Sequence, residues 1–168
     1  ATISCTFNEL QQDYIRINSD EYLHKKEFSI NEEKLISIKS TLANILNGNS
    51  FISLSDIIGF DKFPEIGFEW NALILESIIY EFDVGHKLIY PKVKDKRYPK
   101  GLLVNDTCKF SSYDEIIVHM LKEDKIKTIS EEKLRKYLQL KGVIVNVLPQ
   151  ELFSSEIMEY KNEVFDII

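Results

Sequence analysis

The chain has few of the residues and spacings that mark an enzyme or a metal site. Among its 168 residues are two cysteines, three histidines and six glycines. They form no Cys-x-x-Cys pair, no Gly-x-Ser-x-Gly and no phosphate-binding glycine loop, so a zinc ribbon, a nucleophile elbow and a P-loop are not expected. His24, His86 and His119 lie in separate segments without the spacing of metal ligands. We therefore expect a chain that is not an enzyme, with no catalytic or metal-binding residues and no cofactor.

Long apolar runs and a secretion signal are also missing. No apolar run approaches the ~20 residues of a membrane span, and the opening ATISCTF lacks the basic flank of a signal peptide. Cys5 and Cys108 lie far apart, so without a sign of secretion we expect two free thiols rather than a disulfide. These absences predict a cytoplasmic protein outside the membrane. The initial Ala indicates either a piece of a longer protein or removal of Met, and the composition, high in Ile and Lys, suggests a bacterial source.

The residues that are present predict a packed core, since 44% are hydrophobic and 29% are charged. In residues 1–28, TISCTF has the pattern of a short strand, NELQQDYIRI that of a helix, and NSDEYLHKKEF that of an irregular segment. Ser29 and Glu32 then form a capping-box pattern ahead of apolar residues at helical spacing, which predicts a helix over about 30–47 that stops at Gly48. SFISL has the pattern of a short strand, and SDIIGF that of a short helix.

A nearly all-apolar helix and a hairpin are expected next. The helix covers about 68–83, and its apolar residues surround most of its circumference, as in a buried helix. Within it, Glu76 is interpreted as lying on the solvent side of the helix rather than as a catalytic carboxylate. HKLIYPKV and KGLLVN are two strand-like runs, so residues 87–105 are predicted to form a long β-hairpin with KDKRYPK at its tip.

This order of helix, short strand, short helix, core helix and hairpin resembles the winged-helix variant of the helix-turn-helix superfamily. The resemblance covers about residues 30–105, rests on element order rather than on a residue motif, and makes the hairpin the wing. A second, shorter pass of the same order is expected from the capping pattern of Ser112 and Glu115, the strand-like KIKTIS, a helix capped by Ser130, and the strand-like VIVNVL. A final amphipathic helix is expected to close the chain, with its apolar face formed by Ile157, Val164, Phe165 and Ile168.

The resulting fold class is mainly α with small β-hairpins (α+β), arranged as tandem winged-helix-like units. We expect an N-terminal arm or linker over 1–28 and a unit with a basic wing over 29–107. A second, shorter unit with the C-terminal helix is expected over 108–168.

Charge decides which of these elements is a candidate for contacting nucleic acid. In the helix-turn-helix superfamily the third helix usually enters the major groove of DNA. Between Phe63 and His86 the chain has no Lys or Arg but five acids, which opposes binding to phosphates. The core helix is therefore a poor candidate for reading DNA.

Two other segments carry clustered cations. The predicted tip of the hairpin and the predicted helix SEEKLRKYLQLK are the candidate nucleic-acid-binding sites. Their residues are Lys92, Lys94, Lys96, Arg97, Tyr98 and Lys100 in the hairpin, and Lys133, Arg135, Lys136 and Gln139 in the helix. Each set also has a structural interpretation, because charged residues protect strand edges and Lys complements the C-terminal end of a helix dipole. For the helix, the structural interpretation is preferred.

Three functional hypotheses follow. The first is a non-enzymatic DNA-binding module that contacts double-stranded DNA through the basic wing, within a larger regulatory or DNA-processing protein. The second is a protein–protein interaction or self-association module, which the overall charge of −6 fits better. The third is an accessory domain of an enzyme whose catalytic part lies outside these residues.

Overall fold

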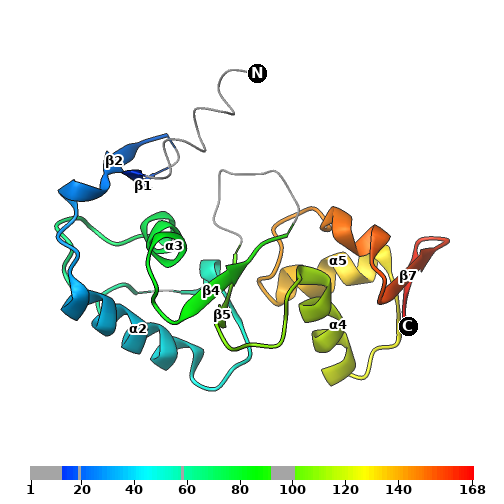
Figure 1. The fold of residues 1–168 in the computed structure, drawn as a ribbon. Helices are drawn as coiled ribbons and strands as arrows, with labels where there is room; N and C mark the ends of the chain where they lie inside the picture. Colours follow the sequence, from blue (N-terminus) through cyan, green and yellow to red (C-terminus); the bar gives the residue numbers. More distant parts are fainter. Residues whose placement is uncertain (1–12, 19, 58, 92–100) are drawn as a thin grey trace.

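The computed structural model describes residues 13–18, 20–57, 59–91 and 101–168. The first half of the chain forms a unit of two helices and a small sheet (Figure 1). Its elements are α2 (Glu32–Leu46), β3 (Ile52–Ser53), the 3-10 helix η2 (Leu54–Asp56), α3 (Ala72–Glu81), β4 (His86–Ile89) and β5 (Leu102–Asn105). The sheet is antiparallel with the strand order β3-β5-β4, so the third strand lies between the first and the second.

The second half repeats this arrangement with a shorter first helix and a shorter hairpin. Its elements are α4 (Tyr113–Glu123), β6 (Thr128–Ser130), α5 (Glu131–Leu140), the 3-10 helix η3 (Gln150–Ser154), β7 (Met158–Lys161) and β8 (Val164–Ile167). The order of this antiparallel sheet is β6-β8-β7, so its third strand is again central. The expected α+β class is therefore confirmed.

The N-terminal segment differs from its expectation. Residues 14–16 were expected in a helix and 22–24 in an irregular segment, but they form the antiparallel strands β1 (Tyr14–Arg16) and β2 (Tyr22–His24), followed by the 3-10 helix η1 (Lys25–Glu27). The side chain of Ile15 is completely buried in the core of the first half. Only the middle residue of β1 is buried, as expected for a strand whose successive side chains point to opposite faces. A helix packed on the core would have needed several apolar residues along one face. TISCTF lies outside the described residues.

Two expectations for the C-terminal part are wrong. Residues 143–148 form a loop instead of a strand, and the expected final helix is the hairpin β7–β8. Asn162 and Glu163 have φ of 52° and 60°, the left-handed conformation that a two-residue hairpin turn of type I′ requires. The hairpin supplies both partners of the β6 sheet, because β8 pairs with β6 and with β7. Residues 143–148 pair with none of these three strands.

Some helices begin at other capping residues than the sequence predicted. Asn31 rather than Ser29 caps α2, accepting a hydrogen bond from the backbone N–H of Lys34, while Ser29 accepts from the Lys34 ammonium. The core helix expected over 68–83 begins only after Asn71, whose side-chain oxygen accepts from two backbone N–H groups of α3. At α4 the Ser112 side chain makes no capping bond, and it is the Ser111 N–H that donates to Glu115. Ser130 caps α5 as expected.

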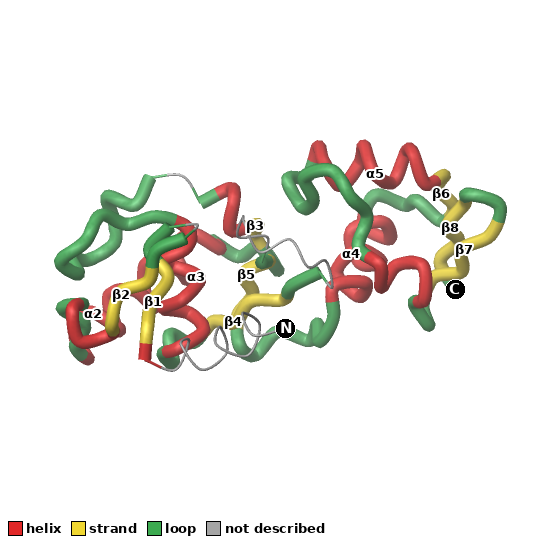
Figure 2. Tube along the Cα trace, turned by 90° about the horizontal axis from the view of Figure 1, so that it is seen from above, coloured by secondary structure: helices red, strands yellow, loops and turns green. Residues whose placement is uncertain are grey.

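The β3-β5-β4 sheet lies between the two hydrophobic clusters that the described residues form. In β5, the buried Leu103 packs in the cluster with α2 and α3, whereas Leu102 and Val104 pack in the cluster with α4 and α5. Ile89 of β4 also belongs to the second cluster. Figure 2 shows this sheet between the helices of the two halves. Successive side chains of a strand point to opposite faces, so β5 contributes to the cores on both sides.

Candidate functional site

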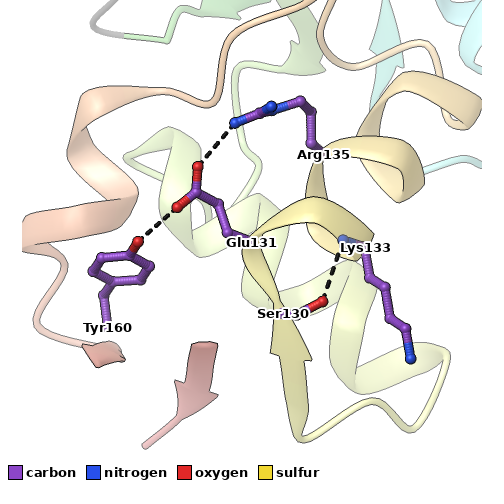
Figure 3. A network of polar contacts seen from close by, with 5 residues as sticks. All are labelled: Ser130, Glu131, Lys133, Arg135 and Tyr160. Carbon is purple, nitrogen blue, oxygen red and sulfur yellow. Dashed lines mark hydrogen bonds and ion pairs between the residues drawn. The ribbon is translucent and has the colours of Figure 1, made fainter. Parts of the chain in front are cut away.

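The predicted basic face of α5 is largely engaged in contacts of its own chain. An Arg135 nitrogen lies 2.8 Å from a Glu131 carboxylate oxygen, and the other carboxylate oxygen accepts a 2.6 Å hydrogen bond from the Tyr160 hydroxyl (Figure 3). Lys136 forms a 2.6 Å ion pair with Glu132, one helical turn earlier. This pairing lowers the pKa of the exposed Glu132 carboxyl, first through the hydrogen bond from Lys136 and then through its charge. Two of the three predicted cations on this helix therefore already have a carboxylate partner.

The remaining two predicted residues of α5 behave differently from each other. The Gln139 amide donates a 2.7 Å hydrogen bond to the backbone oxygen of Val145, so it holds the following loop against the helix. The Lys133 backbone N–H donates to the Ser130 cap, and its side chain extends away from Glu131 (Figure 3). No ion pair of the Lys133 ammonium is found among the described residues. Of the α5 set, Lys133 alone keeps an available charge within the described part of the chain.

The predicted site at the tip of the first hairpin lies outside the described residues. This applies to its six residues Lys92, Lys94, Lys96, Arg97, Tyr98 and Lys100. The strands that lead into it are described, and they pair in the expected antiparallel way. Pro91 and Gly101, which flank the segment, are both buried. The hairpin base is thus anchored in the protein at both ends.

Glu76 of α3 contacts this hairpin base. Its carboxylate accepts a 2.8 Å hydrogen bond from the hydroxyl of Tyr90, the residue that follows β4. Burial raises the pKa of Glu76, while the Tyr90 hydrogen bond and the charge of Arg16 partly oppose that shift. Burial, followed by the charge of Glu76, raises the pKa of Tyr90 in turn. The interpretation of Glu76 as a solvated residue is therefore incomplete, because its carboxylate is half-buried and joins α3 to the hairpin.

The outer side of α3 is covered by the N-terminal hairpin (Figures 1 and 2). The Arg16 backbone N–H donates to the Ser77 hydroxyl oxygen at 3.3 Å, and the Asn71 amide donates to the Ile17 carbonyl at 2.8 Å. Lys25 forms an ion pair with Glu81 at the C-terminal end of the helix. A helix covered in this way cannot insert into a DNA groove without losing these contacts. The structure and the acidic sequence therefore both argue against α3 as a DNA reader.

An exposed apolar surface at the end of α5 was missed by the sequence analysis. We call its three residues, Leu140, Val145 and Val147, the Leu140 patch. Their exposed fractions are 88%, 53% and 65%, large values for apolar side chains. The Gln139–Val145 hydrogen bond keeps the loop beside the last turn of α5, where Leu140 lies. The signal that could have revealed the patch is the lack of charge over 142–150, within which VIVNVL was predicted to be a strand.

His86, His119 and Cys108 have structural surroundings. His86 is buried, and its Nδ1 lies 2.8 Å from the Val84 carbonyl oxygen. The His119 ring packs against the Phe110 ring in a tilted arrangement and lies 3.4 Å from Glu123 on the same helix. Cys108 is free and half-buried. Within residues 13–18, 20–57, 59–91 and 101–168, no three His, Cys, Asp or Glu side chains lie close enough together to hold a metal ion.

Comparisons with known proteins assign no family. None of the described helices is both long and apolar enough to cross a membrane. No protein-family model and no solved structure matches the chain. A probable glycine dehydrogenase (decarboxylating) subunit 1 of Sulfolobus acidocaldarius is 28% identical over 72 residues. The match covers 42% of this chain but 16% of that protein, so the chain spans a small part of that curated relative, and we assign no activity from it.

Proposed function

We propose that this chain is a protein-interaction module built from two tandem winged-helix-like units, with the Leu140 patch as a contact surface. The matching strand orders β3-β5-β4 and β6-β8-β7, each with its central strand last in the chain, support the winged-helix part of the proposal. The N-terminal strands then belong to the first unit, since they cover α3. A cytoplasmic location is part of the proposal, and the free Cys108 thiol supports it.

The observation that carries this function is the clustering of large exposed apolar side chains at one place. Single exposed apolar residues are ordinary, but adjacent ones mark interaction surfaces. Of the other large exposed apolar residues of the described chain, Ile36 lies on α2, whereas Tyr80 and Tyr90 lie near each other at the base of the first hairpin, where the Tyr90 hydroxyl bonds to Glu76. The Leu140 patch instead brings together two elements that are adjacent in the sequence and tied by a hydrogen bond.

Site-specific photo-crosslinking tests this function. A photoreactive amino acid replaces Val147 in one variant and Ile36 in a control, because both side chains are large, apolar and more than half exposed. We expect covalent products with protein at position 147 but not at position 36. The additional substitution Leu140→Lys should remove those products, because it places a charge in the contact. Equal products at both positions, or none at position 147, would contradict the proposal.

Contact with the backbone of double-stranded DNA is a second candidate function. It is favoured by five cations and one acid between Tyr90 and Gly101, at the wing position of the proposed first unit. The coverage of α3 and the ion pairs of α5 would restrict this binding to phosphates. Such binding carries little sequence information and weakens steeply as salt rises.

Fluorescence anisotropy with a labelled DNA duplex tests this candidate. Affinity should fall by at least about tenfold between ~50 and ~200 mM salt if several phosphates are contacted. The triple variant Lys94→Gln, Lys96→Gln, Arg97→Gln should reduce the slope of log affinity against log salt by about 3. The matched control Lys133→Gln, Lys136→Gln should leave the slope unchanged. An absence of binding at low salt, or an unchanged slope in the triple variant, would remove this candidate.

A further inference from the structure

We propose that the first half of the chain carries a second contact surface, which binds a Lys or Arg side chain from a basic segment of a partner protein. The surface consists of Glu76 and Tyr80 of α3 and of Tyr90 at the base of the first hairpin, and we call it the Glu76 surface. It lies on different elements from the Leu140 patch. The inference therefore goes beyond the proposed function and does not depend on it.

The three side chains of the Glu76 surface meet at one carboxylate. Tyr80 follows Glu76 by four positions on α3, which places the two side chains next to each other on the same face of the helix. The Tyr90 hydroxyl donates a 2.8 Å hydrogen bond to one oxygen of the Glu76 carboxylate. No group of the described chain donates to the second oxygen. That oxygen can therefore accept a hydrogen bond from an incoming donor.

The two tyrosines provide exposed aromatic surface beside this carboxylate. The exposed fractions of Tyr80 and Tyr90 are 72% and 41%, and Glu76 between them is half-buried. Tyrosine is enriched at protein interfaces, because its ring offers a large apolar area and its hydroxyl tolerates water. A cation placed over such a ring is attracted by the quadrupole of the ring. Rings next to a carboxylate thus suit both the apolar stem and the charged head of Lys or Arg.

The local charge favours a cation over an anion as the occupant. Between Phe63 and His86 the chain has five acids and no Lys or Arg. Arg16 of β1 acts on Glu76 through its charge, while its Nε donates to the Asn18 carbonyl. Burial nevertheless raises the pKa of Glu76, so the positive charge nearby does not compensate for the hydration that the carboxylate has lost. A cation from a partner would supply the missing compensation.

This compensation links binding to pH. The charged and titratable groups around Glu76 come from three elements: Tyr80 on α3, Tyr90 at the hairpin base, and Arg16, Asp20 and Tyr22 in the N-terminal hairpin. A bound cation favours the ionised form of the Glu76 carboxyl, whereas a proton competes with the cation. Affinity for the cation should therefore rise as pH rises through the pKa of Glu76 in the folded protein.

Calorimetric titration of the full chain with a blocked tetraarginine peptide tests the proposal, at about pH 7 and about 50 mM salt, where exposed charges are weakly screened. The wild type should bind the peptide. Glu76→Gln should weaken binding by at least about fivefold, because it removes the charged acceptor. Tyr80→Leu should weaken it by about two- to fivefold, because it keeps an apolar side chain but removes the ring.

Glu132→Gln is the matched control, because it removes the same charge from an exposed site in the second half. It should bind the peptide like the wild type. An equal loss in Glu76→Gln and Glu132→Gln would show general attraction to the net charge of −6 and would overturn the proposal. An absence of binding, or equal binding of a blocked tetraglutamate peptide, would overturn it as well.

Two further measurements identify the occupant and the contact. The affinity of the wild type relative to Glu76→Gln should rise from about pH 4 to about pH 7, and a constant ratio would overturn the proposal. Self-association of the chain that Glu76→Gln abolishes would assign the surface to a second copy and overturn the partner. A chain that photo-crosslinks at Val147 but does not bind the peptide would lose the Glu76 surface and keep the proposed function.

Discussion

Glu76 shows how a single residue can have a role that its position in a sequence pattern does not reveal. Between Phe63 and His86 the chain has five acids and no Lys or Arg, so helix α3 has no cation of its own to pair with them. The fold supplies the missing partners, with the Tyr90 hydroxyl donating to Glu76 and Lys25 pairing with Glu81. Burial still dominates at Glu76 and raises its pKa, which means that the protonated form is more favourable in the folded protein than in the unfolded chain.

The Glu76→Gln variant should show this preference as a change in pH dependence. A raised pKa contributes stability that is fully present below the ordinary pKa of Glu, about 4.3, and is lost as pH rises through the folded value. Urea unfolding should therefore show the wild type losing stability relative to Glu76→Gln as pH rises from about 4 to 8. The difference should be up to about 1 kcal/mol, the scale of single partly exposed charges.

The control for this prediction is Glu132→Gln, because the pKa of Glu132 is lowered by Lys136. A lowered pKa contributes stability above the unfolded value, and this stability is lost as pH falls through the folded one. The two variants should therefore differ from the wild type with opposite pH trends. Parallel trends would show that the environment of Glu76 does not penalise its charge.

At the scale of elements, the N-terminal hairpin is held by the same residue that starts α3. Asn71 accepts hydrogen bonds from the N–H groups of Leu73 and Ile74 and donates its amide to the Ile17 carbonyl. The cap and the tether are chemically separable, because an aspartate keeps the acceptor but removes the donor. The start of the helix and the position of β1–β2 are thus coupled through one side chain.

Asn71→Ala should lower the free energy of unfolding by about 1–3 kcal/mol, through loss of the cap and of the tether. Asn71→Asp should cost less, because it retains the cap, yet both variants should speed amide exchange in β1 and β2. Asn31→Ala provides the control, since Asn31 caps α2 and, within the described part of the chain, forms no hydrogen bond with the hairpin. Unchanged exchange of residues 14–17 and 21–24 in Asn71→Ala would show that other contacts hold the hairpin.

At the scale of the molecule, the two halves share the β3-β5-β4 sheet instead of meeting through a linker. Leu103 packs on one side of β5 and Leu102 with Val104 on the other, so neither cluster is complete without this strand. The predicted boundary between residues 107 and 108 therefore matches the repeat of elements. It nevertheless separates three buried residues, Ile89, Leu102 and Val104, from the rest of the second cluster. We expect the two halves to unfold together.

Leu138→Ala tests this cooperativity. Leu138 is fully buried in the second cluster, while the single tryptophan, Trp70, packs against the first. The substitution should lower the free energy of unfolding by about 2–5 kcal/mol. If the halves unfold together, it should also lower the urea midpoint measured by Trp70 fluorescence. For the same loss of stability, this shift should equal the shift caused by Leu42→Ala in the first cluster. A Trp70 transition that is unmoved in Leu138→Ala would show two independently folding halves.

Local sequence patterns determined the elements that depend on neighbours within a few residues. Helical spacing located α2, α4 and α5, and the Ser130 cap and the pairing of β4 with β5 were also predicted correctly. Only the tertiary structure decided the elements whose apolar residues fit more than one pattern. Val164 and Phe165 fit a helix or a strand, and the available place in the β6 sheet selected the strand. Residues 143–148 had the stronger strand pattern but pair with no strand of the described chain, and Val145 and Val147 remain exposed. A helix satisfies its own backbone groups, whereas a strand forms only where the tertiary structure brings a partner alongside it, so a strand pattern alone does not decide the outcome.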